Sequence, residues 1–106
     1  DLIYVNVKDL PVFIPNTFSP NDDGFNDFFT VFGDPTVFKV KMIHIFNRWG
    51  DLVFETTDIL PSDETKGWDG KFKGLVQSDG MYVYNLEIEL FDKSTRQLKG
   101  EVFLLK

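Results

Sequence analysis

The 106-residue sequence contains no cysteine, and this absence removes two kinds of site at once. A disulfide framework cannot form, and no thiolate is available to bind a metal. Stability must therefore come from an ordinary hydrophobic core, for which 12 Phe, 3 Tyr and 2 Trp supply large rings. At this length we expect one domain with one core. Because there is no cysteine, cysteine usage does not indicate the cellular compartment of the protein.

Positive charge is scarce as well, because 11 Lys and Arg stand against 17 Asp and Glu, a formal net charge of -6. Nucleic acids and anionic membranes attract proteins through basic patches, so we expect no nucleic-acid partner and no direct membrane insertion. No apolar run approaches the roughly 20 residues of a spanning helix. The first ten residues lack the features of a signal peptide, and Asp1 is not an initiator Met. We therefore expect a piece of a longer chain or a processed product.

Sustained helical spacing of apolar residues is also missing, whereas alternation with a period of two recurs along the chain. The pattern is clearest in residues 80–91, where the apolar residues of one face are Tyr82, Tyr84, Leu86, Ile88 and Leu90. Residues 38–46 alternate too, but the pattern changes phase at Met42 and Ile43. This change predicts a bulge or a doubly buried strand end.

Shorter strands are predicted between turn-rich stretches, at residues 2–7, 11–14, 28–32, 52–56, 72–76 and 98–105. About seven or eight short strands in a chain of this size predict an all-β, antiparallel β-sandwich. Asn47 to Gly50 is expected to form a bulged hairpin loop, and Asp69-Gly70 a tight primed turn. Residues 56–67 are expected to form an exposed polar connection.

Catalysis has little support in the sequence. The only histidine, His44, lies inside a predicted strand between Ile43 and Ile45, so we expect it to be structural or exposed rather than a catalytic base. The acidic residues that cluster in one short loop are too local to flank a sugar bond from two sides. We expect that the protein is not an enzyme.

That acidic loop, "FSPNDDGFND" at residues 18–27, contains Asp22, Asp23 and Asp27. One interpretation is structural: Asp and Asn side chains form Asx turns, and Gly24 allows a positive φ. The other is calcium, because hard oxygen donors on a glycine-bearing loop suit Ca²⁺, with these three aspartates as ligands. The EF-hand version fails, since counting from Asn21 places apolar or amide side chains where that loop needs a glycine and a bidentate glutamate.

Trp49 and Trp68 allow two interpretations. Exposed rings form stacking platforms for carbohydrate, whereas buried rings would plug the ends of a small sandwich and donate their N–H to a turn. We favour the second for both residues. Arg48, one of only two arginines, is expected to pair with a loop aspartate or to stack on an aromatic ring.

Five motifs occur in order: "IPNTFSPNDDGFNDFF", "IFNRWGDLVFE", "GWDGKF", "DGMYVY" and "KGEVFLLK". This set resembles the gliding motility-associated C-terminal domain of Bacteroidota surface proteins, the type B sorting domain of the type IX secretion system. The resemblance implies an immunoglobulin-like β-sandwich over residues 11–106, with residues 1–10 as a linker or the end of a preceding domain. One departure is Asp22, where the family usually has glycine, and the added carboxylate favours a cation or a basic partner nearby.

The resemblance also implies a function. Such domains end large secreted proteins, often adhesins, and direct them from the periplasm across the outer membrane of a Gram-negative bacterium to the cell surface or medium. Their expected partner is a PorP/SprF-type outer-membrane protein, and the cargo is the upstream part of the same polypeptide. An extracellular carbohydrate-binding or adhesive module is the alternative. No cofactor is expected apart from the Ca²⁺ considered above.

The motif residues concentrate in turns rather than in apolar strand positions, which suggests recognition by a partner. Loops gather at the two ends of a sandwich, and Trp and Arg often dominate interfaces. We therefore expect the first two turns to form one end surface, with Arg48 and Trp49 as anchors. The expected partner-binding residues are Asn21, Gly24, Asn26, Asp27, Arg48, Trp49, Asp69 and Gly70.

Overall fold

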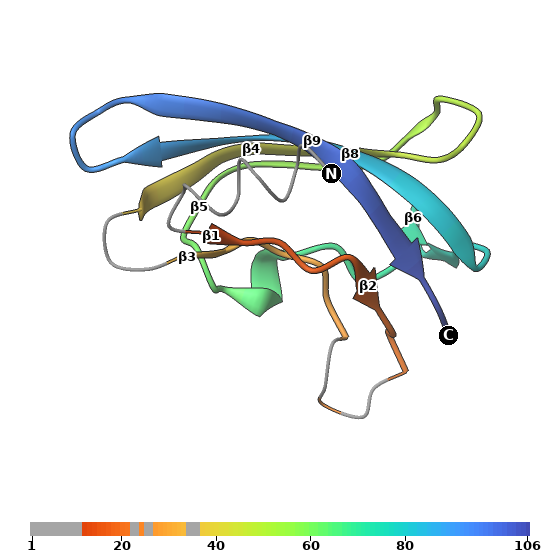
Figure 1. Cartoon of the computed structure of the whole chain (residues 1–106). Coiled ribbons are helices and arrows are strands. Elements are labelled where there is room, and N and C mark those ends of the chain that lie inside the picture. Colours follow the sequence, from red (N-terminus) through yellow and green to blue (C-terminus); the bar gives the residue numbers. More distant parts are fainter. Residues whose placement is uncertain (1–11, 22–23, 25–26, 34–36) are drawn as a thin grey trace.

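The computed structural model describes residues 12–21, 24, 27–33 and 37–106, and in this part of the chain the protein is all-β (Figure 1). Its largest unit is a five-stranded sheet with the order β2-β9-β8-β4-β5. The bounds of these strands are β2 Thr17–Phe18, β4 Val37–Phe46, β5 Leu52–Ile59, β8 Gly80–Leu90 and β9 Thr95–Leu104. No helix in the described ranges is both long and apolar enough to cross a membrane.

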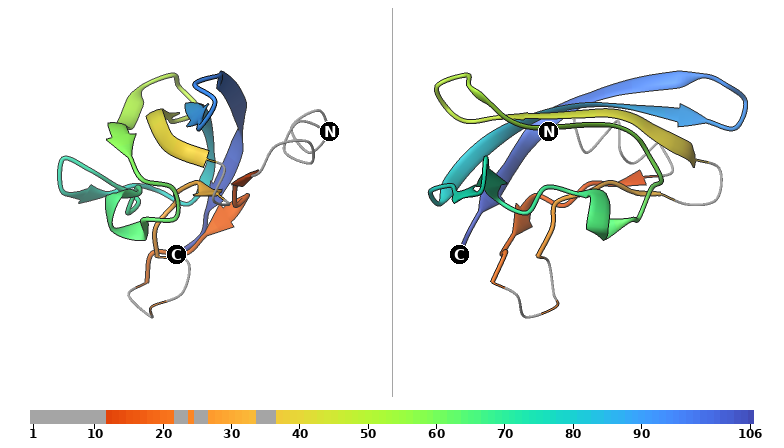
Figure 2. Two further views of the ribbon diagram at one scale, coloured as in Figure 1. Left: turned by 90° about the vertical axis from the view of Figure 1, so that its left-hand side faces the viewer. Right: turned by 180° about the vertical axis from the view of Figure 1, so that it is seen from behind.

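A second, thinner layer covers one face of this sheet, as the two views of Figure 2 show. It contains the antiparallel pair β1 (Val12–Phe13) and β3 (Phe32–Gly33) and the short 3-10 helix η1 (Glu64–Lys66). A small antiparallel hairpin, β6 (Lys71–Phe72) and β7 (Leu75–Val76), follows η1. The predicted all-β sandwich is thus confirmed, although the two layers differ greatly in size.

Two details of the sheets differ from the sequence prediction. The β2–β9 pair is parallel, so the large sheet is mixed rather than purely antiparallel. The described residues form nine strands rather than about seven, because residues 72–76 contain parts of two strands and the turn between them. Their connection is the primed turn, with positive φ at Lys73 (53°) and Gly74 (81°), which a type I′ turn requires. The prediction of that turn at Asp69-Gly70 is therefore wrong.

The polar connection predicted at residues 56–67 is shorter than expected. Strand β5 continues to Ile59, which is buried, because Ile59 pairs with Val40 and extends the core. The remainder contains η1, whose N-cap is Asp63: its carboxylate accepts from the Thr65 N–H. The strand predicted at 2–7 lies outside the described residues.

The core lies between the inner face of the large sheet and the covering layer. Strand β8 alternates as predicted, with Tyr82, Tyr84, Leu86 and Ile88 buried and their sequence neighbours at least partly exposed. The phase change predicted in residues 38–46 is a bulge: the pairing of β4 with β8 shifts register between Val40 and Met42. This extra residue returns Ile43 to the core face that Val40 occupies.

Trp68 anchors the covering layer to this core. It is fully buried, and its ring lies 5.3 Å from that of Phe18 and 5.0 Å from that of Tyr82, measured between centroids. The indole Nε1 donates to the Lys71 carbonyl at 2.9 Å. The expectation that Trp68 is a core residue with its N–H on a turn is confirmed.

Gly100 lies opposite Tyr84 in the β8–β9 pair, and the buried Tyr84 ring covers it. A Cβ at position 100 would stand 2.5 Å from the Tyr84 hydroxyl oxygen, much closer than atoms can approach. The ring has little room to move away, because it also contacts Phe29 with centroids 5.4 Å apart. The absence of a side chain at position 100 is thus what allows Tyr84 to pack.

We predict that Gly100→Ala lowers the free energy of unfolding by about 1 to 3 kcal/mol, the usual effect of overpacking. The neighbouring exposed Lys99→Ala is the control and should change it by no more than about 0.5 kcal/mol. Urea denaturation of both variants measures the difference. Equal stabilities would contradict the steric explanation.

Candidate partner-binding site

The tip of the β4–β5 hairpin, Asn47 to Gly50, is held by hydrogen bonds that centre on Asn47. Its Oδ1 accepts from the backbone N–H groups of Trp49 and Asp51, both at 2.9 Å. Its carbonyl accepts from the Gly50 N–H at 3.0 Å, and Gly50 has the positive φ of 86° that the bulged loop was predicted to need. The hairpin therefore presents the two residues between Asn47 and Gly50 in a defined conformation.

Those two residues are Arg48 and Trp49, and both point outward. Trp49 is 71% exposed, so the expectation that it plugs the core is wrong. The reason is its position: it lies at the hairpin tip, beyond the last residue of β4, and the described residues of the covering layer do not bury it. The Arg48 guanidinium carbon lies 4.7 Å from the centroid of the Trp49 ring, so the stacking alternative for Arg48 is confirmed.

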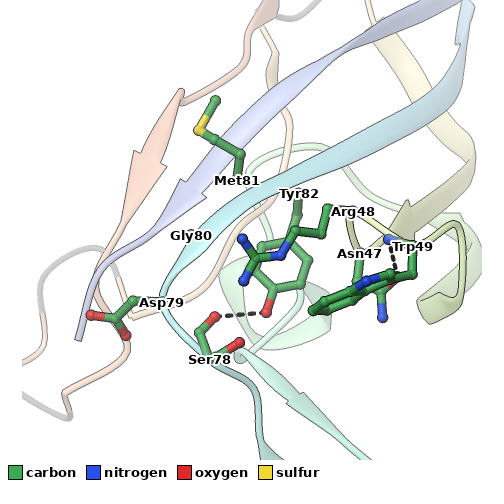
Figure 3. Close-up of a pocket in the computed structure, with 8 residues that line it drawn as sticks. All are labelled: Asn47, Arg48, Trp49, Ser78, Asp79, Gly80, Met81 and Tyr82. Atoms are coloured by element: carbon green, nitrogen blue, oxygen red, sulfur yellow. Dashed lines mark hydrogen bonds between the residues drawn. The ribbon is translucent and has the colours of Figure 1, made fainter.

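A shallow pocket separates this tip from the segment that leads into β8 (Figure 3). Arg48 reaches toward Tyr82, whose hydroxyl donates to the Ser78 carbonyl at 2.7 Å. Asp79 points away from Arg48 and lies 3.8 Å from the Lys106 ammonium group. Arg48 forms no ion pair with a described residue; its guanidinium lies over the Trp49 ring. The lining residues are Asn47, Arg48, Trp49, Ser78, Asp79, Gly80, Met81 and Tyr82.

The acidic loop is fastened by one of its own carboxylates. Asp27 accepts from the Asn21 N–H through Oδ1 at 3.1 Å and from the Gly24 N–H through Oδ2 at 2.8 Å. Gly24 has a φ of 84°, which a residue with a side chain rarely adopts. These contacts confirm the structural interpretation for Asp27 and Gly24. Asp22, Asp23 and Asn26 lie outside the described residues, so the calcium site stays a prediction.

The third motif turn contains Asp69 and Gly70 and packs against the base of the acidic loop. The Asp69 carboxylate accepts from the Lys71 N–H at 3.0 Å. Gly70 is buried with a φ of 82°, and a Cβ there would stand 3.0 Å from Pro20 Cγ. Packing against Pro20 explains why glycine occupies this position, whereas Asp69 is exposed.

The ends of β2 and β4, which lead toward the acidic loop and into the Arg48 hairpin, lie toward the same end of the large sheet, but a single end surface formed by the two turns stays a prediction. The pairs Phe18–Leu104, Gly80–Leu104 and Phe46–Val83 align the end of β2 with the ends of the other strands. The two turns are not adjacent, however, because β9 and β8 lie between β2 and β4. With about 4.8 Å between neighbouring strands, β2 and β4 are about 14 Å apart.

Residues 78–81 were missing from the expected site. They lie beside the hairpin because β4 pairs with β8 through Phe46 and Val83. The motif "DGMYVY" marked this segment as part of the resemblance, but the local pattern contained no information about its distance from Arg48. Strand pairing between residues far apart in sequence decides that distance.

The remaining titratable candidate, His44, lies in β4 with its side chain partly exposed, and its Nε2 is 3.5 Å from a Glu55 carboxylate oxygen. A surface pair of this kind offers no nucleophile for the imidazole to activate. The expectation that His44 is structural or exposed is confirmed.

Comparison with protein-family models matches residues 12–104 to the type IX secretion signal domain, CHU_C. The match spans nearly the whole chain, so the protein belongs to this family of secretion signals, as the ordered motifs suggested. It is not a catalytic family. Comparison with curated proteins found no matching relative.

We predict that Asp27→Ala lowers the free energy of unfolding by about 0.5 to 2 kcal/mol, as loss of a helix-capping side chain does, because two backbone donors lose their acceptor. Thermal melts with a chelator and with added Ca²⁺ separate this effect from metal binding. A structural role gives the same loss in both solutions. A bound cation would instead raise the melting temperature of the unsubstituted protein when Ca²⁺ is added.

Proposed function

We propose that the chain is a sorting signal that an outer-membrane protein of the PorP/SprF type recognises through Arg48 and Trp49. Membership of the family establishes the coarser part of this function: the domain serves the type IX secretion machinery, which exports proteins to the cell surface or the extracellular space. The identity of the receptor and the recognition surface are the new elements. The cargo is the adhesin-like polypeptide attached upstream, which passes through the periplasm.

The observation that carries the proposal is the exposure of Arg48 and Trp49 on a rigid hairpin. A tryptophan that is 71% exposed contributes little to the core, yet the Asn47 hydrogen bonds hold its backbone and the Arg48 guanidinium packs on its ring. An ordered aromatic ring loses little conformational entropy when a partner covers it. Arg48, stacked on that ring, adds a positive charge that is not neutralised by a described carboxylate.

Carbohydrate binding through Trp49 is the second candidate, and the exposed ring is the observation that favours it. Sugar stacking uses the face of the ring, and the Arg48 guanidinium occupies one face at 4.7 Å. A protein partner that contacts both residues uses this arrangement as it stands. We therefore place receptor binding first.

The first test asks whether the signal is sufficient. Residues 11–106, fused behind an unrelated periplasmic reporter, should bring it to the surface or medium of a host with the type IX system. Immunoblots of periplasm, surface and medium measure the distribution. A reporter that remains periplasmic with residues 11–106, but leaves the cell with more upstream sequence, would show that this segment is not the whole signal.

The second test removes the anchor. Arg48→Ala in the same fusion should reduce export about thirtyfold, the factor that corresponds to an interface residue worth about 2 kcal/mol. Arg96→Ala is the matched control, because Arg96 is the other arginine, is exposed and, among the described residues, donates a hydrogen bond to the adjacent Thr95 carbonyl alone. Melting temperatures of both purified variants should stay near that of the unsubstituted protein. Normal export of Arg48→Ala, or its unfolding, would contradict the anchor role.

A further inference from the structure

Strand β5 is an outer strand of the large sheet, and one of its edges has no neighbouring strand among the described residues. Its strand pairing with the described part of the chain is with β4 alone, from Leu52 to Ile59. The other described backbone hydrogen bonds do not reach it either. An edge strand leaves every second pair of backbone N–H and C=O groups pointing outward, and these groups are the template for one more strand.

The opposite side of the sheet is protected in a way that β5 is not. Strand β2 covers β9 only at Phe103 and Leu104, but the uncovered part of β9 carries the exposed charges Arg96, Lys99 and Glu101. Charged side chains are the usual protection of an edge. In β5 the stretch from Leu52 to Thr57 has a single charge, Glu55.

The far end of β5 is closed to further pairing. Asp58 has a positive φ of 55°, which interrupts the extended backbone, and its carboxylate lies 3.1 Å from the Lys39 ammonium group. The open edge is therefore a short stretch of about six residues, from Leu52 to Thr57. That length suits a short peptide strand rather than a second large sheet.

A groove of about 220 Å³ runs beside this stretch, between β5 and the β6–β7 hairpin. Phe54 and Phe72 are half-buried and form its apolar lining, and Glu55 and Lys73 stand at its rim. The volume is below the roughly 300 Å³ at which small-molecule pockets begin, so it suits one or two side chains. The hairpin adds exposed apolar surface through Leu75 (69%) and Val76 (56%).

We infer that β5 receives an extended segment of the secretion machinery, which pairs with Leu52–Thr57 as an added strand and places an apolar side chain in the groove. This inference rests on the proposed function, because it assumes that the machinery binds this domain. The backbone of the edge recognises a strand, and the groove selects an apolar side chain on one face of that strand. Glu55 favours a neutral or basic neighbour at the pairing position.

A second copy of the chain is a poorer occupant. Each copy carries a net charge of -6, which opposes association, and antiparallel self-pairing centred on the groove would bring two Glu55 carboxylates together. We therefore assign the edge to a different protein.

The test compares two charge reversals on opposite edges, Glu55→Lys and Glu101→Lys, in the 106-residue chain fused to the export reporter. Both residues are exposed strand positions, so the folded domain should tolerate both changes. A lysine at position 55 opposes the addition of another strand to the edge and reverses the charge there. We expect export of Glu55→Lys to fall at least about tenfold and Glu101→Lys to be exported normally. Export of Glu55→Lys at the unsubstituted level, or an equal loss in both variants, overturns the inference.

Single cysteine variants provide a second measurement, which does not depend on whether Glu55→Lys folds. The chain has no cysteine of its own, so maleimide reacts only at the introduced position. In cells whose export is arrested, Glu55→Cys should be protected from maleimide and Glu101→Cys labelled, and urea extraction should expose both. Equal labelling overturns the inference. Sedimentation of the purified chain tests the other occupant: a dimer that Glu55→Lys dissociates would assign the edge to a second copy instead.

The two proposals fail separately. If Arg48→Ala loses export and Glu55→Lys does not, the hairpin surface stands and the strand-addition site falls. If Glu55→Lys loses export and Glu55→Cys is protected from maleimide while Arg48→Ala is exported, binding to the machinery stands but the hairpin is not its anchor.

Discussion

The packing of Trp68 between Phe18 and Tyr82 is the contact on which the rest of the structure depends. The large sheet has one apolar face, and only a thin layer of short strands is available to cover it. A buried tryptophan removes about 150 to 250 Å² from water, more than any other single residue of that layer can. Its Nε1 bond to the Lys71 carbonyl also positions the turn that supports the acidic loop through Gly70 and Pro20.

Because the covering layer is thin, it leaves one end and one edge of the large sheet exposed among the described residues. The β4–β5 hairpin extends beyond the covered region, and Trp49 at its tip is therefore exposed. Trp68, the other tryptophan, is buried. The outer edge of β5 is likewise left without a described neighbouring strand. In the proposed function, rigid turns and an open strand edge are features that a receptor can recognise without unfolding the domain.

Local pattern predicted the long strands well, because each has one buried and one solvated face, and this difference produces the alternation in β8 and the phase change in β4. It failed where strands are two residues long: β6 and β7 were read as one strand, and their turn was placed at Asp69-Gly70 rather than Lys73-Gly74. Two residues are too few to show a period. The parallel β2–β9 pair was equally invisible, since pairing direction depends on the path of the chain.

By itself the sequence determined the class of fold, the family and the turns that carry its motifs, because alternation, glycine positions and side-chain type are local properties. Tertiary structure alone decided which tryptophan is buried, which segments lie beside Arg48, and which edge of the sheet is open. Those outcomes depend on contacts between residues far apart in the chain, such as Phe46 with Val83 and Phe18 with Leu104. Trp49 and Trp68 have the same side chain, but Trp68 lies in the covering layer and is buried, whereas Trp49 lies at a hairpin tip and is exposed.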